Sequence, residues 1–142
     1  MMAKQLSVFI ENRKGRLSEV LEVLKSNGVN ILSMSLADTT EYGLLRLIVN
    51  KPELGKEKLT ENGFSSLLSD VIILKIQHEV GSLQELLKAI EEADVNVEYM
   101  YGLSIDGDEA YVVLKSSNVE KTGEVLEAKG VETLLPEDVV KL

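Results

Sequence analysis

The sequence predicts an α+β fold in which one βαββαβ unit occurs twice. Residues 15–31 (GRLSEVLEVLKSNGVNI) align with residues 81–97 (GSLQELLKAIEEADVNV) at an offset of 66 residues. Towards the end of each unit the offset is 67, so one residue is inserted, and we place it in a hairpin turn. Two copies are too few for a solenoid, so we expect a duplicated domain with units at residues 1–69 and 70–142.

Each unit opens with a strand followed by an amphipathic helix. The runs QLSVFIE (5–11) and VIILKIQ (71–77) are short, apolar and rich in β-forming residues, which is typical of strands. Apolar residues then recur at i, i+3, i+4 and i+7, the spacing of one helix face: Leu17, Val20, Leu21 and Leu24 in the first unit, and Leu83, Leu86, Leu87 and Ile90 in the second. Gly28 is expected to end the first helix, and Ser82 with Glu85 matches a capping box at the start of the second.

Two strands, a helix and a short strand complete each unit. The strand pairs are predicted at 29–38 with 42–50 and at 95–105 with 109–117, and DGDE (106–109) is a hairpin turn. The second helix has Pro52 near its start in one unit and Gly130 at its end in the other. The closing strands are 63–69 and 131–135. This order is the ferredoxin-like plan, which predicts two packed units with antiparallel sheets and the helices on one face.

Composition and charge exclude several functions. The formal net charge is −9; residues 1–69 hold nine basic and eight acidic residues, whereas residues 70–142 hold six basic and sixteen acidic ones. Such a chain should repel nucleic acid. The absence of cysteine excludes disulfides and thiolate metal sites, and fits a cytoplasmic protein. No apolar run is long enough for a membrane span, and the start of the chain does not match a signal peptide.

The loop before the first helix is the strongest candidate site. Arg13, Lys14 and Arg16 flank Gly15 at the expected N-terminus of the helix, although positive charge there opposes the helix dipole. Free backbone N–H groups, a glycine and basic side chains together suit a carboxylate or phosphate. The alternative is that these side chains are solvated and that the glycine only makes the turn.

The matching loop of the second unit has different chemistry. His78 replaces Asn12, Glu79 replaces Arg13, and Ser82 replaces Arg16, so an anion site there would be weaker. His78 is the only histidine, which excludes a histidine-pair metal site or a serine triad within one chain, and it can equally be an ordinary surface residue.

Two further sets of residues could contribute. Asn30 and Asn96 follow the helices, and we expect them near the loops, where an amide could contact a polar ligand; they can also be plain turn residues. Tyr99 and Tyr101 lie on one face of their strand, where they either pack or form an aromatic wall over a ligand.

The chain resembles tandem ACT-domain proteins. The resemblance is carried by the loop glycine, the helix and the sequence entering the next strand, in "SVFIENRKGRLSEVLEVLKSNGVNILSMSLADTTEYGLLRLIVN" and "VIILKIQHEVGSLQELLKAIEEADVNVEYMY". It departs from the family pattern at Lys14 and Val80, where proline is common, and at Asp94, where glycine is expected. The resemblance implies a regulatory module that binds an amino acid between ACT units, and it implies these ligand-binding residues: Asn12, Lys14, Gly15, Arg16, Leu17, Asn30 and Ile31, with a mirror set of His78, Gly81, Ser82, Leu83, Asn96 and Val97.

The sequence thus favours a non-enzymatic amino-acid sensor without a cofactor, forming a homodimer and acting on a partner enzyme or regulator. Three alternatives remain at this point. One is a structural or oligomerising subunit without a ligand. Another is an RNA-binding βαββαβ module, for which only Tyr99 and Tyr101 offer aromatic residues. The third is a small hydrolase acting on acyl phosphates, for which the loop NRKGR is the only support.

Overall fold

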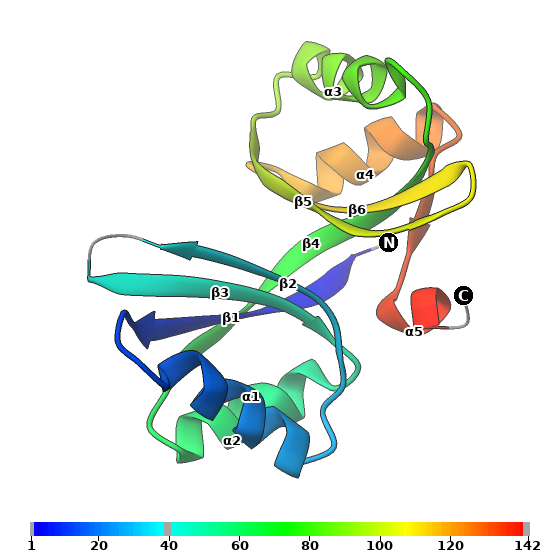
Figure 1. Ribbon diagram of the computed structural model, residues 1–142. Helices are drawn as coiled ribbons and strands as arrows, with labels where there is room; N and C mark the ends of the chain where they lie inside the picture. The colour runs from blue at the N-terminus through cyan, green and yellow to red at the C-terminus, as the bar shows by residue number, and fades with distance from the viewer. Residues whose placement is uncertain (1, 39–40, 141–142) are drawn as a thin grey trace. The chain divides into compact units, whose positions relative to one another are not determined.

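The computed structural model describes residues 2–38 and 41–140. The chain divides into two compact units, Lys4–Ser69 and Asp70–Leu142 with Met1–Ala3. In each unit two helices cover one face of an antiparallel sheet, as the sequence predicts (Figure 1).

The first unit contains the elements β1 to α2 and the beginning of β4. Their bounds are β1 (Ala3–Glu11), α1 (Arg16–Ser26), β2 (Ile31–Asp38), β3 (Tyr42–Val49), α2 (Pro52–Glu61) and β4 (Ser65–Gln77). The strands β2, β3 and β1 pair antiparallel in that order. α1 buries Val20 and Leu24 against alternate residues of the sheet, including Leu6 and Leu45. The apolar face of α1, which the spacing of its apolar residues predicted, therefore packs against the core.

The second unit repeats this arrangement with the rest of β4. Its further elements are α3 (Ser82–Glu92), β5 (Val97–Asp106), β6 (Glu109–Ser116), α4 (Val119–Ala128), β7 (Glu132–Leu134) and α5 (Pro136–Val140). β7, β4, β6 and β5 lie side by side in that order and are all antiparallel. Leu86 and Ile90 of α3 pack with Leu74 and Leu114 of the sheet in a separate core cluster. Each unit therefore has its own hydrophobic core.

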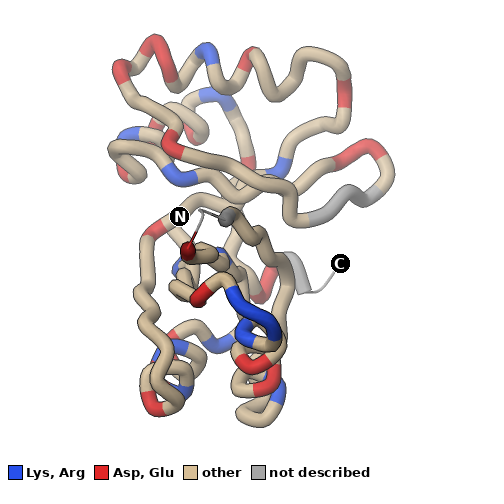
Figure 2. Tube along the Cα trace, turned by 60° about the vertical axis from the view of Figure 1, so that its left-hand side comes forward, with Lys and Arg blue, Asp and Glu red and all other residues tan. Residues whose placement is uncertain are grey.

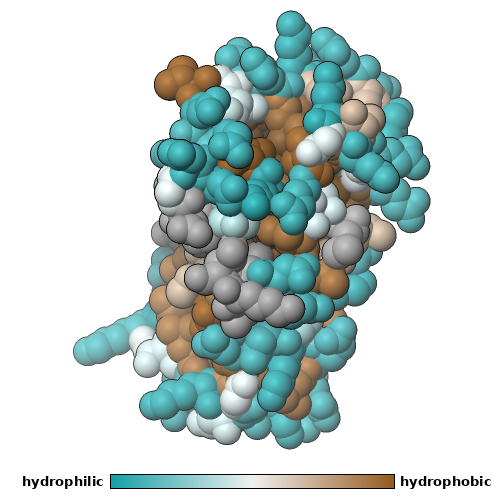
Figure 3. Space-filling view, turned by 90° about the vertical axis from the view of Figure 1, so that its right-hand side faces the viewer, coloured by the Kyte–Doolittle hydropathy of each residue, from teal (hydrophilic) through white to brown (hydrophobic). Residues whose placement is uncertain are grey.

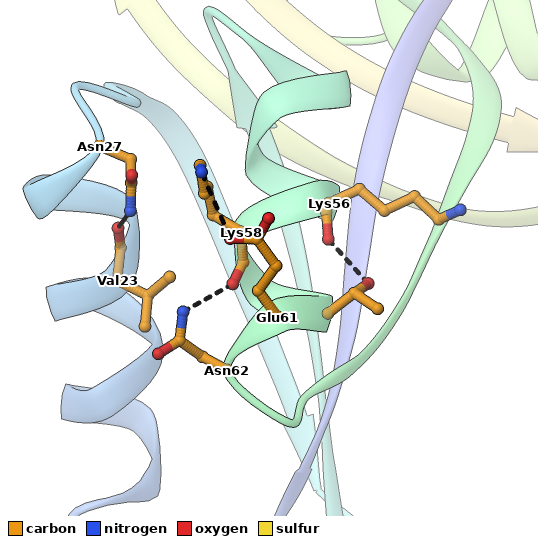
Figure 4. Close-up of polar contacts among 7 residues, drawn as sticks. Val23, Asn27, Lys56, Lys58, Glu61 and Asn62 are labelled. Carbon is orange, nitrogen blue, oxygen red and sulfur yellow. Dashed lines mark hydrogen bonds and ion pairs between the residues drawn. The ribbon is translucent and has the colours of Figure 1, made fainter.

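Asparagine side chains cap the C-terminal ends of both helices of the first unit. The Asn27 amide donates to the Val23 carbonyl over 2.8 Å, and the Asn62 amide donates to the Lys58 carbonyl over 2.8 Å (Figure 4). The Asn27 side chain supplies a donor to a carbonyl near the end of α1, and the Lys58 carbonyl accepts from the Asn62 backbone N–H, over 3.2 Å, as well as from its side chain. Gly28 and Gly63 follow with φ of 70° and 84°, so the predicted end of α1 at Gly28 is confirmed.

Two local expectations are wrong, and one element had no prediction. Residues 63–69 and 71–77 were expected as two strands, but β4 runs unbroken from Ser65 to Gln77, because no glycine or proline interrupts it. Ser82 and Glu85 form no capping box, because Gly81 takes the N-cap position and Ser82 is already inside the helix. The short helix α5 was not anticipated.

The inserted residue lies in a strand and not in the hairpin turn. In the first unit Leu36 pairs with Leu45 and Ala37 with Leu44. In the second unit Gly102 pairs with Val112, but Ser104 and not Leu103 pairs with Tyr111. Leu103 is therefore the extra residue, accommodated as a β-bulge in β5.

Candidate functional site

The loops before α1 and α3 have the same backbone geometry. Gly15 and Gly81 are the N-cap residues, with φ of 89° and 86°, a conformation that side-chain-bearing residues rarely adopt. The amide of Arg16 donates to the Arg13 carbonyl over 3.3 Å, and the amide of Ser82 donates to the Glu79 carbonyl over the same distance. No side chain caps either helix, so backbone donors at both N-termini are available to a ligand.

A cavity lies beside each of these loops, and the two cavities are related by the repeat. The first has a volume of about 350 Å³ and the second about 530 Å³. Every lining residue of the first cavity has its repeat partner in the second; the first is lined by Ile10, Glu11, Asn12, Arg13, Leu17, Leu36 and Gly43, and the partners are Ile76, Gln77, His78, Glu79, Leu83, Gly102 and Ala110. The cross-strand pairs Ile10 with Gly43 and Ile76 with Ala110 confirm this correspondence.

The size difference has a local cause. In the first unit the Leu36 side chain reaches over Gly43, where an added Cβ would lie 3.3 Å from Leu36 Cδ1. In the second unit glycine replaces this leucine, and a Cβ built on Gly102 would meet nothing within 4 Å. The bulge residue Leu103 also lines the second cavity. Glycine at position 102 therefore leaves open the space that Leu36 occupies in the first unit.

The rims of the two cavities carry different charges. In the first unit Arg13 Nε lies 2.8 Å from Glu11 Oε2, so the rim contains an ion pair. Figure 2 shows the basic residues of the loop before α1 in blue, next to acidic residues in red. In the second unit Gln77, His78 and Glu79 occupy the rim, without a lysine or arginine among the lining residues. Lys14 is exposed and is not among the residues that line the first cavity.

The Arg16 side chain, which the sequence suggested as an anion-binding group, contacts other residues of the protein and not the first cavity. Its Nη1 lies 2.6 Å from Glu19 Oε2, and its Cζ lies 4.2 Å from the centroid of the Phe64 ring. Its side chain is only 17% exposed, and it does not line the first cavity. Arg16 therefore connects α1 to the segment after α2. The equivalent position in the second unit, Ser82, lines a different cavity of about 350 Å³ together with Glu85, Lys75 and Lys129.

The asparagines lie at the other end of each unit. Asn30 and Asn50 exchange two hydrogen bonds, Asn30 N to Asn50 Oδ1 over 2.7 Å and Asn50 N to Asn30 O over 3.1 Å. Asn50 follows the last residue of β3, whereas the Asn12 amide donates to the carbonyl of Glu41, which precedes the first residue of β3. The two ends of β3 are roughly 23 Å apart, at about 3.3 Å per residue. The expectation that Asn30 lies near the loop of its own unit is therefore wrong, and Asn96, bonded to Ser117, has the same placement. Ile31 and Val97, which begin β2 and β5, pack against the cores.

Tyr99 and Tyr101 stack on each other, with ring centroids 6.5 Å apart and planes at 14°. Met100 between them packs into the second core, so the two rings project from the sheet face opposite the helices. Neither ring lines the cavity beside Gly81. The structure therefore does not bring the tyrosines to the loop.

Sequence reasoning missed Gly102, Leu103 and Lys75. The change of offset between the two repeats indicated an inserted residue but did not show that it lies at the cavity.

Lys75 forms two ion pairs. Its Nζ lies 3.1 Å from Glu109 Oε2 and 3.5 Å from Glu132 Oε2. The hydrogen bond to Glu109, with the negative charges of both glutamates, raises the pKa of Lys75 above 10.5, although desolvation acts against this.

Within the described residues no cluster of three or more metal-ligating side chains occurs. No helix in that part of the chain combines the length and apolar character needed to cross a membrane. Apolar surface is nonetheless visible between hydrophilic side chains (Figure 3), and Leu36 and Val80 are among the exposed apolar residues.

Comparison with known proteins identifies the family that has this duplicated fold. A family profile described as ACT domain pair matches residues 1–142, and the chain belongs to this family. Protein BT0572 from Bacteroides thetaiotaomicron has a similar structure, with a TM-score of 0.93, 37% sequence identity, and coverage of 100% of this chain and 98% of that one. Among curated proteins no sequence matches.

More distant structures share the fold. The regulatory subunit of aspartate kinase from Thermus thermophilus, in its ligand-free form, has a TM-score of 0.62 at 14% identity, covering 88% of this chain and 91% of that one. The regulatory subunit of aspartate kinase from Thermus flavus has a TM-score of 0.60 at 15% identity, covering 88% and 90%. At these identities the likeness concerns the fold alone.

Proposed function

We propose that the protein is a non-catalytic regulatory sensor that binds a free amino acid at a loop cavity of an ACT unit. The observation that supports this most directly is the pair of repeat-related cavities, each beside an uncapped helix N-terminus. Both volumes fall in the range of about 300–1,000 Å³ that small-molecule sites occupy.

The chemistry of the cavities suits a zwitterion. Backbone N–H groups at the start of a helix favour a carboxylate, since they combine free donors with the positive end of the helix dipole. A carboxylate side chain on the rim, Glu11 in the first unit or Glu79 in the second, suits an ammonium group. An α-amino acid carries both groups on one carbon and can use both contacts together.

Regulation follows if the ligand binds two arrangements of the protein with different affinity. Two proteins of similar fold are named as regulatory subunits of aspartate kinase, so we expect the change of arrangement to act on a partner enzyme or regulator. We infer a homodimer, because β2 and β5 each end the order of strands in their unit and an exposed strand edge needs cover. We also infer a cytoplasmic location, which the absence of cysteine fits. Closure of the ligand site by a second ACT unit remains a prediction.

Thermal-shift and calorimetric titration with the twenty amino acids tests the proposal. At least one amino acid should give a saturable shift in melting temperature, and its amine and 2-hydroxy acid analogues should not, because each lacks one of the two charged groups. A flat response to all twenty would refute the amino-acid sensor and favour a structural subunit.

A pair of double variants tests the position of binding. Gly15→Val with Gly81→Val places a side chain at both loops and should abolish the shift. Gly63→Val with Gly130→Val imposes similar backbone strain, with φ of 84° and 73°, away from both loop cavities and should retain it. Circular dichroism of both variants separates lost binding from lost folding. Equal binding by the two double variants would place the ligand elsewhere.

A further inference from the structure

We propose that each chain binds one ligand, in the second unit, and that this ligand is an amino acid with an uncharged apolar side chain. This inference rests on the proposed function and adds the unit, the stoichiometry and the class of side chain. It is carried by the differences between two cavities that the repeat would otherwise make equal.

The first difference is space. Leu36 reaches over Gly43 in the first unit, whereas Gly102 leaves the corresponding volume open, and the cavities measure about 350 and 530 Å³. The extended backbone at Gly102 does not require glycine, because its φ lies outside the left-handed region. The missing side chain is therefore explained by the open volume and not by the backbone conformation.

The second difference is the β-bulge. Leu103 has no counterpart in the first unit, and it lines the cavity directly after Gly102. Bulges redirect side chains and are frequent next to binding sites. The second unit thus differs from the first at two successive residues, and both line the same cavity.

The third difference is polarity. The interior of the second cavity is apolar, formed by Ile76, Leu83, Leu103, Ala110 and Val112. Three of the residues with polar side chains, Gln77, His78 and Glu79, lie together where β4 leads into the loop before α3. The fourth is Tyr111 of β6, whose hydroxyl donates to Glu109 Oε2 over 3.4 Å. A buried charge on the ligand side chain would find no opposite charge among the interior residues, and burial of an unpaired charge is costly. The first cavity instead has Arg13 and Glu11 paired at its rim.

A homologous series of ligands measures the apolar interior. Calorimetric titration of the whole protein with alanine, 2-aminobutyrate, norvaline and norleucine should show affinity rising about fourfold per methylene until the cavity is full. The titration should give one site per chain. Lysine and glutamate should bind at least tenfold more weakly than norleucine, because their charges would be desolvated.

Substitutions locate the site. Gly102→Leu fills the second cavity and should weaken norleucine binding at least tenfold with an unchanged circular dichroism spectrum. Leu36→Met, at the repeat-equivalent position of the first unit, is the matched control and should leave affinity and stoichiometry unchanged. A stoichiometry of two, wild-type binding by Gly102→Leu, or loss of binding in Leu36→Met would overturn the inference.

The outcomes distinguish the two proposals. If charged amino acids bind best, or if binding is lost only in first-unit variants, the amino-acid sensor stands and the inference fails. If no amino acid binds at all, both fail.

Discussion

Replacing Arg16 with methionine tests whether this arginine serves stability and not ligand binding. Methionine keeps an unbranched apolar stem at the start of α1 but removes the guanidinium, which lies 4.2 Å from the Phe64 ring and 2.6 Å from Glu19. We expect Arg16→Met to lower the free energy of unfolding while leaving ligand affinity unchanged.

The expected change in the free energy of unfolding follows from two stabilising contributions and one destabilising contribution. A largely desolvated cation–π contact contributes about 1–2 kcal/mol, and the side chain is only 17% exposed. The ion pair with Glu19, which is 55% exposed, adds about 0.5 kcal/mol. Arg16 Nε is buried without a hydrogen-bond partner, and this together with the helix dipole offsets up to about 1 kcal/mol. The net expected loss is about 1 kcal/mol.

Urea unfolding followed by circular dichroism measures this loss, and a shift of the midpoint by roughly 0.5 M is expected. A double-mutant cycle with Phe64→Leu isolates the contact with the ring, and its coupling energy should be about 1 kcal/mol. A coupling energy below about 0.3 kcal/mol, or a loss of amino-acid binding in Arg16→Met, would refute this role of the arginine.

Three other predictions concern stability. The raised pKa of Lys75 means that its ion pairs stabilise the fold fully below pH 10.5 and that this contribution is lost as pH rises through the raised value; the urea midpoint of the wild type should therefore fall more steeply between pH 9 and 12 than that of Lys75→Met. Gly28→Ala should cost about 1 kcal/mol, whereas Asp94→Gly, at the equivalent position with φ of 61°, should gain about 0.5 kcal/mol, and equal signs in urea titration would contradict the backbone argument. Thr122→Val removes two hydrogen bonds of the Thr122 hydroxyl, one of 2.7 Å with the buried Ser116 hydroxyl and one of 2.9 Å to the Asn118 carbonyl, and should lower the melting midpoint by an amount equivalent to about 1–2 kcal/mol; an unchanged midpoint would show that the two bonds together contribute nothing.

The repeat made most of the fold predictable from sequence. The apolar spacing of α1 and α3, the proline that begins α2 and the glycine after α1 are local signals, and the structure has these elements where the signals lie. The unbroken β4 was missed because a strand boundary at 69–70 was inferred from the repeat and not from any turn residue. The capping box was predicted wrongly, because the pattern of Ser82 and Glu85 also fits a helix whose N-cap is the preceding residue, Gly81.

The candidate site was predictable only in part. The loops and their glycines follow from sequence, and the cavities do lie beside them. The placement of Asn30 was not predictable by proximity in the chain, because α1 runs the length of the unit and returns the chain to the opposite end (Figure 1). The orientation of Tyr99 and Tyr101 depended on which alternate residues of β5 face the core.

The sequence by itself determined the duplication, the order of elements and the glycine-led helix starts, because these depend on residues close together in the chain. Only the tertiary structure decided that Leu36 closes one cavity while Gly102 opens the other, and that Arg16 stacks on Phe64. These outcomes depend on pairing register and on side chains that are distant in sequence but adjacent in space, and neither residue type nor spacing along one segment encodes such contacts.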